Sequence, residues 1–275
     1  RGVAEGDLEI VGDTDEKGTA VLFKADGQIF ETLEYEYDTL LVRLREQAFL
    51  NAGLKITLCD KRSERHSDDN DENAEDILHY EGGLKSFVEY YNRNKTALHD
   101  AIHIKTATSN STAEVAIQYN DGYTEDLVSF ANNIHTPDGG THETGFKNAM
   151  TRVFNDFGRE KGYLKEKDEN LNGNDVREGL TAIISVKVTE AQFEGQTKAK
   201  LGNTEVRGLV ENLVYEKLRD FFEENPAVAK IVYEKALSAQ RAREAAKKAR
   251  ELVRRKSALD STRMPGKLSD CSSKD

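Results

Sequence analysis

The spacing of apolar and polar residues in the first part of the chain predicts a strand, a helix and a second strand. Residues 18–26 (GTAVLFKAD) alternate between apolar and polar positions, which is typical of a β-strand. Asp38 is a good N-cap residue, and apolar side chains recur after it at helical spacing. The predicted helical face consists of Leu40, Leu41, Leu44 and Ala48. Residues 54–60 (LKITLCD) predict another strand.

The middle of the chain predicts more helix and strand. Residues 84–91 carry apolar side chains at positions i, i+3, i+4 and i+7, as an amphipathic helix does. Residues 113–120 (AEVAIQYN) alternate strictly, which predicts a half-buried strand, and residues 126–136 predict the next one. The DGG sequence at 138–140 then predicts a turn.

Three helices and a buried strand are predicted in the rest of the chain. The first helix has one apolar face made of Phe146, Met150, Val153, Phe154 and Phe157. A polar loop at 164–175 leads to an apolar run at 180–188, which is typical of a buried strand. The second helix ends at Asn225-Pro226, where asparagine can cap and proline can begin the third helix, expected to reach about Lys256. This order of elements predicts an α+β fold.

Charge is distributed unevenly along the 275 residues, whose net charge is -11. Residues 64–76 contain seven acids and one arginine, so we expect a loop or linker there and a domain boundary near residue 77. Residues 241–256 contain eight basic and two acidic residues, a local charge of +6. Overall acidity argues against nucleic-acid binding by the whole surface, whereas the basic block leaves room for it at one place.

Several classes of protein are disfavoured by what the sequence contains. Cys59 and Cys271 have no metal-ligand spacing and imply no disulfide framework, which fits a reducing cytoplasm. No apolar run of about 18 residues and no signal-peptide core is present, so we expect no membrane span. The sequence does not begin with Met, and we expect it to be a piece of a longer protein.

Two histidines flank the predicted turn, and they have two interpretations. His135 and His142 could form a metal pair, but hydrogen bonds at the turn and at the start of the following helix are the favoured interpretation. No Ser-His-Asp or Cys-His nucleophile set can be argued. We therefore assign no catalytic residue and no metal ligand within the chain.

The segment between the apolar run and the next helix has candidate binding chemistry. It reads FEGQTKAKLGNTEVRGLV from residue 193 and carries Gln196, Thr197 and Lys198 between two glycines. A solvated loop is one interpretation, and an anion site is the other. Lysine is a point charge on a flexible stem, glutamine donates through its amide, and glycine lets the backbone approach a ligand.

The basic block also has two interpretations. It can be a solvated helix packed through the alanine stripe formed by Ala239, Ala242, Ala246, Ala249 and Val253. Alternatively, its lysines and arginines contact the phosphates of a nucleic acid, since such contacts dominate affinity. The sequence does not decide between the two.

Five motifs together resemble one protein family. HTPDGGTHETGFKNAMTRVFN, REGLTAIISVKV, FEGQTKAKLGNTEVR, RAREAAKKARELVRRKSALD and MPGKLSDC occur in the order seen in the B subunits of bacterial type II topoisomerases, which are DNA gyrase and topoisomerase IV. The resemblance runs over nearly all of the chain. It implies that residues 1–77 are the end of a GHKL-type ATPase sandwich. Residues 78–240 would be a transducer domain similar to the second domain of ribosomal protein S5, and residues 241–275 a basic helix leading toward a Toprim domain.

The resemblance implies a function for the complete subunit: hydrolysis of ATP, with Mg2+, coupled to DNA strand passage and supercoiling. Its partners would be DNA, the gyrase A subunit and a second B subunit in an A2B2 heterotetramer, in the cytoplasm. The family's magnesium-ligand helix, adenine-reading aspartate and glycine-rich lid are not among these residues. We therefore expect this chain alone to be inactive.

The resemblance also suggests roles for individual residues. Gln196, Thr197 and Lys198 match the family's loop that contacts the γ-phosphate of ATP, and Thr19 and Val21 match its adenine pocket. The DNA-facing candidates are Arg241, Arg243, Lys247, Lys248, Arg250, Arg254 and Arg255, with Lys147 as a weaker candidate on a cavity wall. Two alternatives are a topoisomerase IV B subunit and a non-enzymatic nucleic-acid-binding module similar to ribosomal protein S5.

Overall fold

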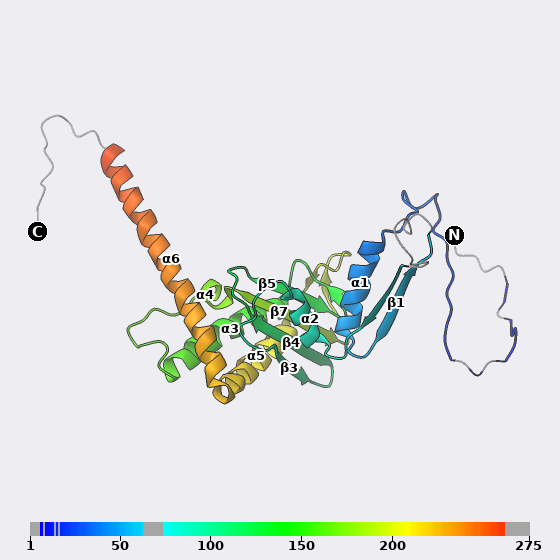
Figure 1. Cartoon of the computed structure of the whole chain (residues 1–275), viewed down its shortest axis with the longest axis horizontal. Coiled ribbons are helices and arrows are strands. Elements are labelled where there is room, and N and C mark those ends of the chain that lie inside the picture. The colour runs from blue at the N-terminus through cyan, green and yellow to red at the C-terminus, as the bar shows by residue number, and fades with distance from the viewer. Residues whose placement is uncertain (1–5, 8, 14, 16, 63–73, 262–275) are drawn as a thin grey trace, which may run out of the picture. The chain divides into compact units, whose positions relative to one another are not determined.

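The computed structural model describes residues 6–7, 9–13, 15, 17–62 and 74–261, without the side chains of residues 74 and 255–261. The chain divides into two compact units, Arg1–Leu40 and Leu41–Asp275. The helices are α1 (Tyr37–Leu50), α2 (Leu84–Tyr91), α3 (Thr141–Glu160), α4 (Gly173–Arg177), α5 (Thr204–Glu224) and α6 (Pro226–Ser261) (Figure 1). The domain limits at residues 77 and 240 remain predictions.

The strand predicted over residues 18–26 is absent. These residues have no regular secondary structure, and Val21, Leu22 and Phe23 are 80, 99 and 73% exposed. A strand is held by backbone hydrogen bonds to a neighbour, and no described strand pairs with this segment. Local alternation is therefore not sufficient to form a strand here.

Helix α1 occurs where the sequence predicted it, with a different start. It begins at Tyr37, so Asp38 lies in the first turn and not at the N-cap. At that position a carboxylate still complements the positive end of the helix dipole. Tyr37 at the start of the helix is buried, and after it burial increases toward the helix end: Leu40 is 38% exposed, whereas Ala48 and Phe49 are buried.

The acidic segment lies between two paired strands. β1 (Lys55–Asp60) confirms the predicted strand, and it pairs antiparallel with β2 (Ala74–His79) from Lys55–His79 to Asp60–Ala74. Residues 63–73, which hold most of the predicted acidic loop, lie outside the described residues. The end of the acidic tract, Ala74–Asp76, is therefore strand and not loop.

The central sheet of the second unit has five strands in the order β3-β4-β7-β5-β6. They are β3 (Ile102–Ala107), β4 (Ser111–Tyr119), β5 (Asp126–Ala131), β6 (Ile134–His135) and β7 (Leu180–Val188). β5 and β7 run parallel, while all other neighbouring strands are antiparallel. β7 lies between β4 and β5, and its residues from Leu180 to Val186 are all buried, so both of its faces are covered, which agrees with its continuous apolar sequence.

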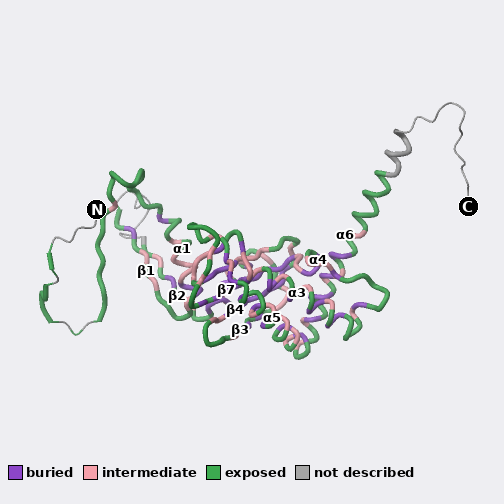
Figure 2. The backbone as a smooth tube through the Cα atoms, turned by 180° about the vertical axis from the view of Figure 1, so that it is seen from behind, coloured by how far each residue is buried: buried purple, intermediate pink, exposed green. Residues whose placement is uncertain are grey.

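Both faces of this sheet are covered, so the prediction of a half-buried β4 is wrong. Val115 and Ile117 belong to a core cluster with residues of α3, α5 and α6. Ala116, on the opposite face, belongs to a second cluster with Phe87 of α2 and Phe49 of α1. Figure 2 shows the resulting buried stretches through the sheet. The α+β class is confirmed, with helices on both faces.

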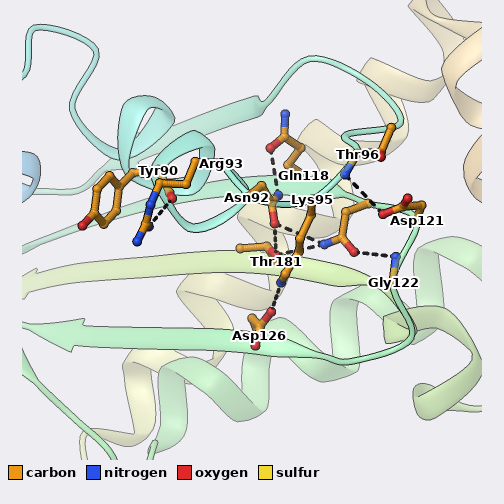
Figure 3. A network of polar contacts seen from close by, with 11 residues as sticks. Tyr90, Asn92, Arg93, Lys95, Thr96, Gln118, Asp121, Gly122, Asp126 and Thr181 are labelled. Carbon is orange, nitrogen blue, oxygen red and sulfur yellow. Dashed lines mark hydrogen bonds and ion pairs between the residues drawn. The ribbon is translucent and has the colours of Figure 1, made fainter.

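A buried polar network joins α2 to the strands β4 and β7 (Figure 3). Asn92 donates to the Oε1 atom of Gln118 at 2.8 Å, and its Oδ1 atom accepts from Thr181 at 2.7 Å and from Asn120 at 3.2 Å. Each of these side chains is at most 5% exposed. The network satisfies polar groups that would otherwise be costly to bury.

Helices α5 and α6 meet at Asn225, as the sequence predicted. The Asn225 carbonyl accepts from the Ala229 N–H at 3.0 Å, and Pro226 is the first residue of α6. α6 continues to Ser261, five residues beyond the expected end. Ala239 is buried, but the rest of the predicted stripe, Ala242, Ala246, Ala249 and Val253, is more exposed, and Figure 2 shows the change along α6.

Candidate phosphate loop and basic groove

The residues expected to bind a phosphate lie on a small β-hairpin. β8 (Phe193–Glu194) and β9 (Lys200–Leu201) pair antiparallel, and the 195–199 loop (Gly195 to Ala199) joins them. Gln196, Thr197 and Lys198 are all exposed on this loop. The structure thus brings the three predicted residues together at the tip of a hairpin.

Lys198 has an unusual backbone conformation for its residue type. Its φ angle is 56°, in the left-handed region, and its N–H donates to the Gly195 carbonyl at 3.3 Å. A non-glycine residue in this region costs about 1–2 kcal/mol. Such strain persists only where the surrounding structure fixes the conformation, and it is enriched at functional sites.

The two lysines of the hairpin differ in their charge environment. Lys200 pairs with Glu194 at 3.1 Å, while Lys198 has no ion pair with any residue that the structure describes. The Nζ atom of Lys198 lies 6.0 Å from the centroid of the Phe193 ring, at the outer limit of a cation–π contact. Lys198 is therefore the hairpin cation whose charge no described carboxylate neutralises.

The base of the hairpin is fixed to the rest of the second unit. The Asp138 N–H donates to the Ala199 carbonyl at 3.0 Å, and the Leu201 N–H donates to the Gly139 carbonyl at 3.1 Å. The Gln192 N–H before the first strand donates to Asn203 after the second strand at 2.7 Å, which closes the base of the hairpin. The loop is thus exposed at its tip and held at both ends, an arrangement that preorganises a binding group.

Of the two histidines near this turn, His142 makes a side-chain hydrogen bond, as the favoured interpretation predicted. His142 is fully buried, and its Nε2 atom lies 3.1 Å from the Thr136 hydroxyl. Burial lowers the pKa of His142 to about 4. Burial also lowers the pKa of His135. Among the described residues, no group of three His, Cys, Asp or Glu could hold a metal ion.

Thr19 and Val21, the adenine-pocket candidates, belong to the first compact unit. Both are exposed, and neither is in a helix or a strand. Their suggested role remains a prediction, because it depends on a pocket that these residues alone do not form.

The candidate DNA-facing residues of α6 separate into two groups. Arg243 donates from Nε and Nη2 to the two carboxylate oxygens of Asp175, at 2.8 and 3.0 Å. Asp175 is 3% exposed and completes a capping box with Asn172 at the start of α4. Arg243 is therefore committed to an internal ion pair. The exposed group comprises Arg241, Lys247, Lys248, Arg250 and Arg254, and the side chain of Arg255 lies outside the described residues.

Lys147 is also engaged, because its Nζ atom pairs with the carboxylate of Glu143 one helical turn earlier on α3. The sequence identified its position off the apolar face of α3 but gave no sign of this partner. The weaker candidate for a DNA-facing wall is thus a partly neutralised lysine.

A groove of about 650 Å3 separates α6 from the loop that follows α3. Its basic lining combines Arg241, Arg243, Lys247 and Lys248 of α6 with Lys165 and Lys167 of the loop, and its acids are Asp168, Glu169, Glu244 and Glu251. Arg159 holds this loop by donating to the carbonyls of Lys165 and Asp168, both at 3.1 Å. Sequence reasoning missed Lys165 and Lys167, because a polar loop gives no sign of what it faces.

No helix in the described part of the chain is both long enough and apolar enough to cross a bilayer.

Solved structures define the class of protein. The chain is similar to the 43K ATPase domain of Thermus thermophilus gyrase B, solved in complex with an aminocoumarin, with 40% identity and a TM-score of 0.70. The match covers 82% of this chain and 59% of that one. The topoisomerase IV ATP-binding domain of Francisella tularensis is also similar, with 26% identity, a TM-score of 0.64, and coverage of 79% and 57%. The fold is that of bacterial type II topoisomerase ATPase regions.

Sequence relatives are more specific. A family model for DNA gyrase B matches residues 83–252. The DNA gyrase B protein of Clostridium acetobutylicum is 58% identical over the whole chain, which spans 42% of that relative, and the DNA gyrase B protein of Bacillus mycoides is 53% identical with 67% of its length covered. The chain belongs to the DNA gyrase B family, as its motifs suggested. It spans less than half the length of the Clostridium relative.

Proposed function

We propose that this chain is the part of an ATP-dependent type II DNA topoisomerase that couples ATP binding and hydrolysis to strand passage and supercoiling. In this proposal residues 1–77 end the ATPase domain, residues 78–240 form the transducer, and residues 241–275 link to the next domain. The complete subunit would act in the cytoplasm with DNA, the gyrase A subunit and a second B subunit, in an A2B2 heterotetramer.

The observation that carries this proposal is the state of Lys198. Its exposed ammonium has no described ion-pair partner, and it stands on a strained backbone at the tip of an anchored hairpin. A charge-assisted contact with a terminal phosphate contributes roughly 1.5–3 kcal/mol. The contact exists only while the γ-phosphate is present, so hydrolysis removes the differential affinity that a nucleotide switch requires.

The neighbouring residues suit the same ligand. The Gln196 amide can donate to a phosphate oxygen, and Thr197 offers a hydroxyl. Thr19 and Val21 are the proposed adenine-side contacts. ATP carries Mg2+, which supplies charge neutralisation at the phosphates, and the side chains proposed here bind and orient the nucleotide.

The proposed DNA contact lies along α6. The exposed basic residues Arg241, Lys247, Lys248, Arg250 and Arg254 support it, together with Lys165 and Lys167 across the groove. Arg243 is better assigned to stabilising the helix, because Asp175 already neutralises it. The groove also contains four acids, so we expect weak, sequence-independent binding rather than tight recognition.

The test uses a full-length gyrase B protein that carries this sequence. Lys198→Ala should weaken binding of a non-hydrolysable ATP analogue by about 10- to 150-fold and should leave ADP binding nearly unchanged. Lys200→Ala is the matched control, because Lys200 lies on the same hairpin but is paired with Glu194. Gln196→Ala should act in the same direction as Lys198→Ala with a smaller effect, since its amide is uncharged.

Two outcomes would overturn the phosphate role. Equal weakening of both nucleotides by Lys198→Ala would indicate a general structural effect, and unchanged binding would return the loop to a solvated surface role.

The alternatives make different predictions. A topoisomerase IV B subunit would show the same nucleotide response, but its complete enzyme would relax and decatenate DNA without introducing negative supercoils. A non-enzymatic nucleic-acid-binding module would bind DNA and show no difference between the ATP analogue and ADP. The 53–58% identities to gyrase B proteins favour gyrase.

A further inference from the structure

The turn before α3 packs directly against the second strand of the Lys198 hairpin. Two backbone hydrogen bonds join them, from Asp138 to Ala199 and from Leu201 to Gly139, at 3.0 and 3.1 Å. Gly140 and Leu201 add a parallel β-bridge. The contact therefore fixes residues one and three positions after Lys198.

Gly140 makes this close approach possible. Its φ angle is 147°, a conformation that residues with a side chain rarely adopt. A Cβ atom at this position would lie 2.5 Å from the carbonyl oxygen of Leu201 and 2.7 Å from its nitrogen. Both are backbone atoms, which cannot rotate out of the way, so a larger residue must push the hairpin away from the turn.

The other side of the turn rests on a buried polar cluster. The Thr136 N–H donates to the Ser129 carbonyl at 2.9 Å, the two hydroxyls lie 2.7 Å apart, and His142 contacts the Thr136 hydroxyl. All three residues are at most 2% exposed. The turn is thus a firm support that links the sheet, α3 and the hairpin.

We infer that Gly140 is a positioning residue for Lys198. By letting the turn hold Ala199 and Leu201, it keeps the 195–199 loop in the strained conformation that presents the lysine ammonium to a phosphate. When this support is lost, Lys198 relaxes to a negative φ angle and its ammonium leaves that position. This inference rests on the proposed phosphate role of Lys198 and deepens it.

The experiment compares two glycine substitutions in a full-length gyrase B protein carrying this sequence. Gly140→Ala introduces the clash with Leu201. Gly162→Ala is the matched control, because Gly162 also has a positive φ angle, 78°, but a Cβ atom there would meet nothing within 4 Å. Binding of a non-hydrolysable ATP analogue and of ADP is measured for each variant, together with the thermal midpoint of unfolding.

Gly140→Ala should weaken analogue binding by about tenfold and change ADP binding by less than about twofold, since only the analogue retains the γ-phosphate. Gly162→Ala should lower the thermal midpoint of unfolding, and it should not change the binding of the analogue relative to the binding of ADP. In the double variant, Gly140→Ala should add little to Lys198→Ala, because both remove the same contact. Equal weakening of analogue and ADP by Gly140→Ala, or full additivity with Lys198→Ala, would overturn the inference.

The same measurements separate this inference from the proposed function. If Lys198→Ala weakens analogue binding more than ADP binding and Gly140→Ala does not, the positioning role is wrong and the phosphate role stands. If Lys198→Ala does not weaken analogue binding more than ADP binding, the phosphate role is wrong, and the inference about Gly140 is wrong with it. Should Gly140→Ala not fold, Thr136→Val keeps the side-chain volume, removes the hydroxyl that steadies the turn, and is expected to act in the same direction.

Discussion

Arg243 and Asp175 lie 68 residues apart in sequence and form a two-pronged ion pair, with nitrogen–oxygen distances of 2.8 and 3.0 Å. The pair ties the basic helix α6 to the first turn of α4. Asp175 also closes the capping box of α4, so one carboxylate serves two helices. This places Arg243 among the residues that stabilise the fold.

Asp175→Asn should therefore destabilise the second unit. It removes the charge that Arg243 needs while preserving the shape of the side chain. Because Arg243 is partly exposed, we expect a loss of roughly 1–3 kcal/mol in the free energy of unfolding, measured by urea titration. Glu194→Gln breaks the exposed pair with Lys200 and should cost less than about 1 kcal/mol. A similar loss for both variants would contradict the structural role of the Arg243 pair.

The DNA proposal predicts a salt dependence that specific lysines control. Each phosphate contact contributes about 0.9 to the slope of log K against log salt concentration. The double substitution Lys247→Gln and Lys248→Gln should lower that slope by about 1.8, measured by fluorescence anisotropy with duplex DNA. Neutralising Arg254, Arg255 and Lys256 together should also lower it.

Two further variants act as controls for this measurement. Lys230→Gln also lies on α6 but outside the groove and beside Glu234, and it should leave the slope unchanged. Arg243→Gln should reduce stability with little change in slope. If the Lys247 and Lys248 substitutions do not alter the slope, these residues belong to a solvated face.

His142 predicts a pH dependence of stability. Its folded-state pKa is about 4, below the ordinary value of 6.5, because the ring is buried. Between these two values the unfolded chain binds a proton that the folded chain does not, so stability falls as the pH falls. The difference amounts to about 2 kcal/mol between pH 7 and pH 5.

The measurement is urea unfolding at both pH values for the wild type and for His142→Gln, which cannot titrate. The variant should be less stable at pH 7, because it disturbs a buried contact with Thr136, but its pH profile should be flatter by about 2 kcal/mol. Parallel profiles would show that His142 does not titrate differently in the folded and unfolded states.

The chain alone should not turn over ATP. Its proposed nucleotide contacts, Gln196, Thr197, Lys198, Thr19 and Val21, can bind phosphate or line a base pocket. None of them is a carboxylate that could ligate Mg2+ or act as a general base. A coupled phosphate-release assay should show only background turnover, and turnover that Lys198→Ala abolishes would refute this expectation.

Local periodicity predicted the longer helices well, because a helix forms its backbone hydrogen bonds within one segment, but the short helix α4 (Gly173–Arg177) begins inside the segment predicted to be a polar loop. Phe146 and Phe157, for example, are buried on one face of α3 as expected. The strands were predicted less reliably, since each depends on a partner elsewhere in the chain. Residues 18–26 alternate but have no described partner, whereas Ala74–Asp76 look like acidic loop but pair with β1.

The candidate sites could also be predicted only where their residues lie within one segment of the chain. The motif around Lys198 could be recognised from its residues and their resemblance to a family, because the three residues are consecutive. The docking of Gly140 on Leu201, the pairing of Arg243 with Asp175, and the lysines at 165 and 167 across from α6 join distant segments. Nothing in the local sequence signals such contacts.

Helix α6 runs for 36 residues without a described break. At about 100° of rotation and 1.5 Å of rise per residue, the helix fixes both the angular position and the distance of its last turn relative to its first turn. Inserting one residue after Arg243 would rotate the distal end by about 100°, whereas inserting seven would restore the phase to within about 20° while lengthening the helix by about 10 Å. A pair of such insertions would therefore separate torsional from axial coupling through this helix.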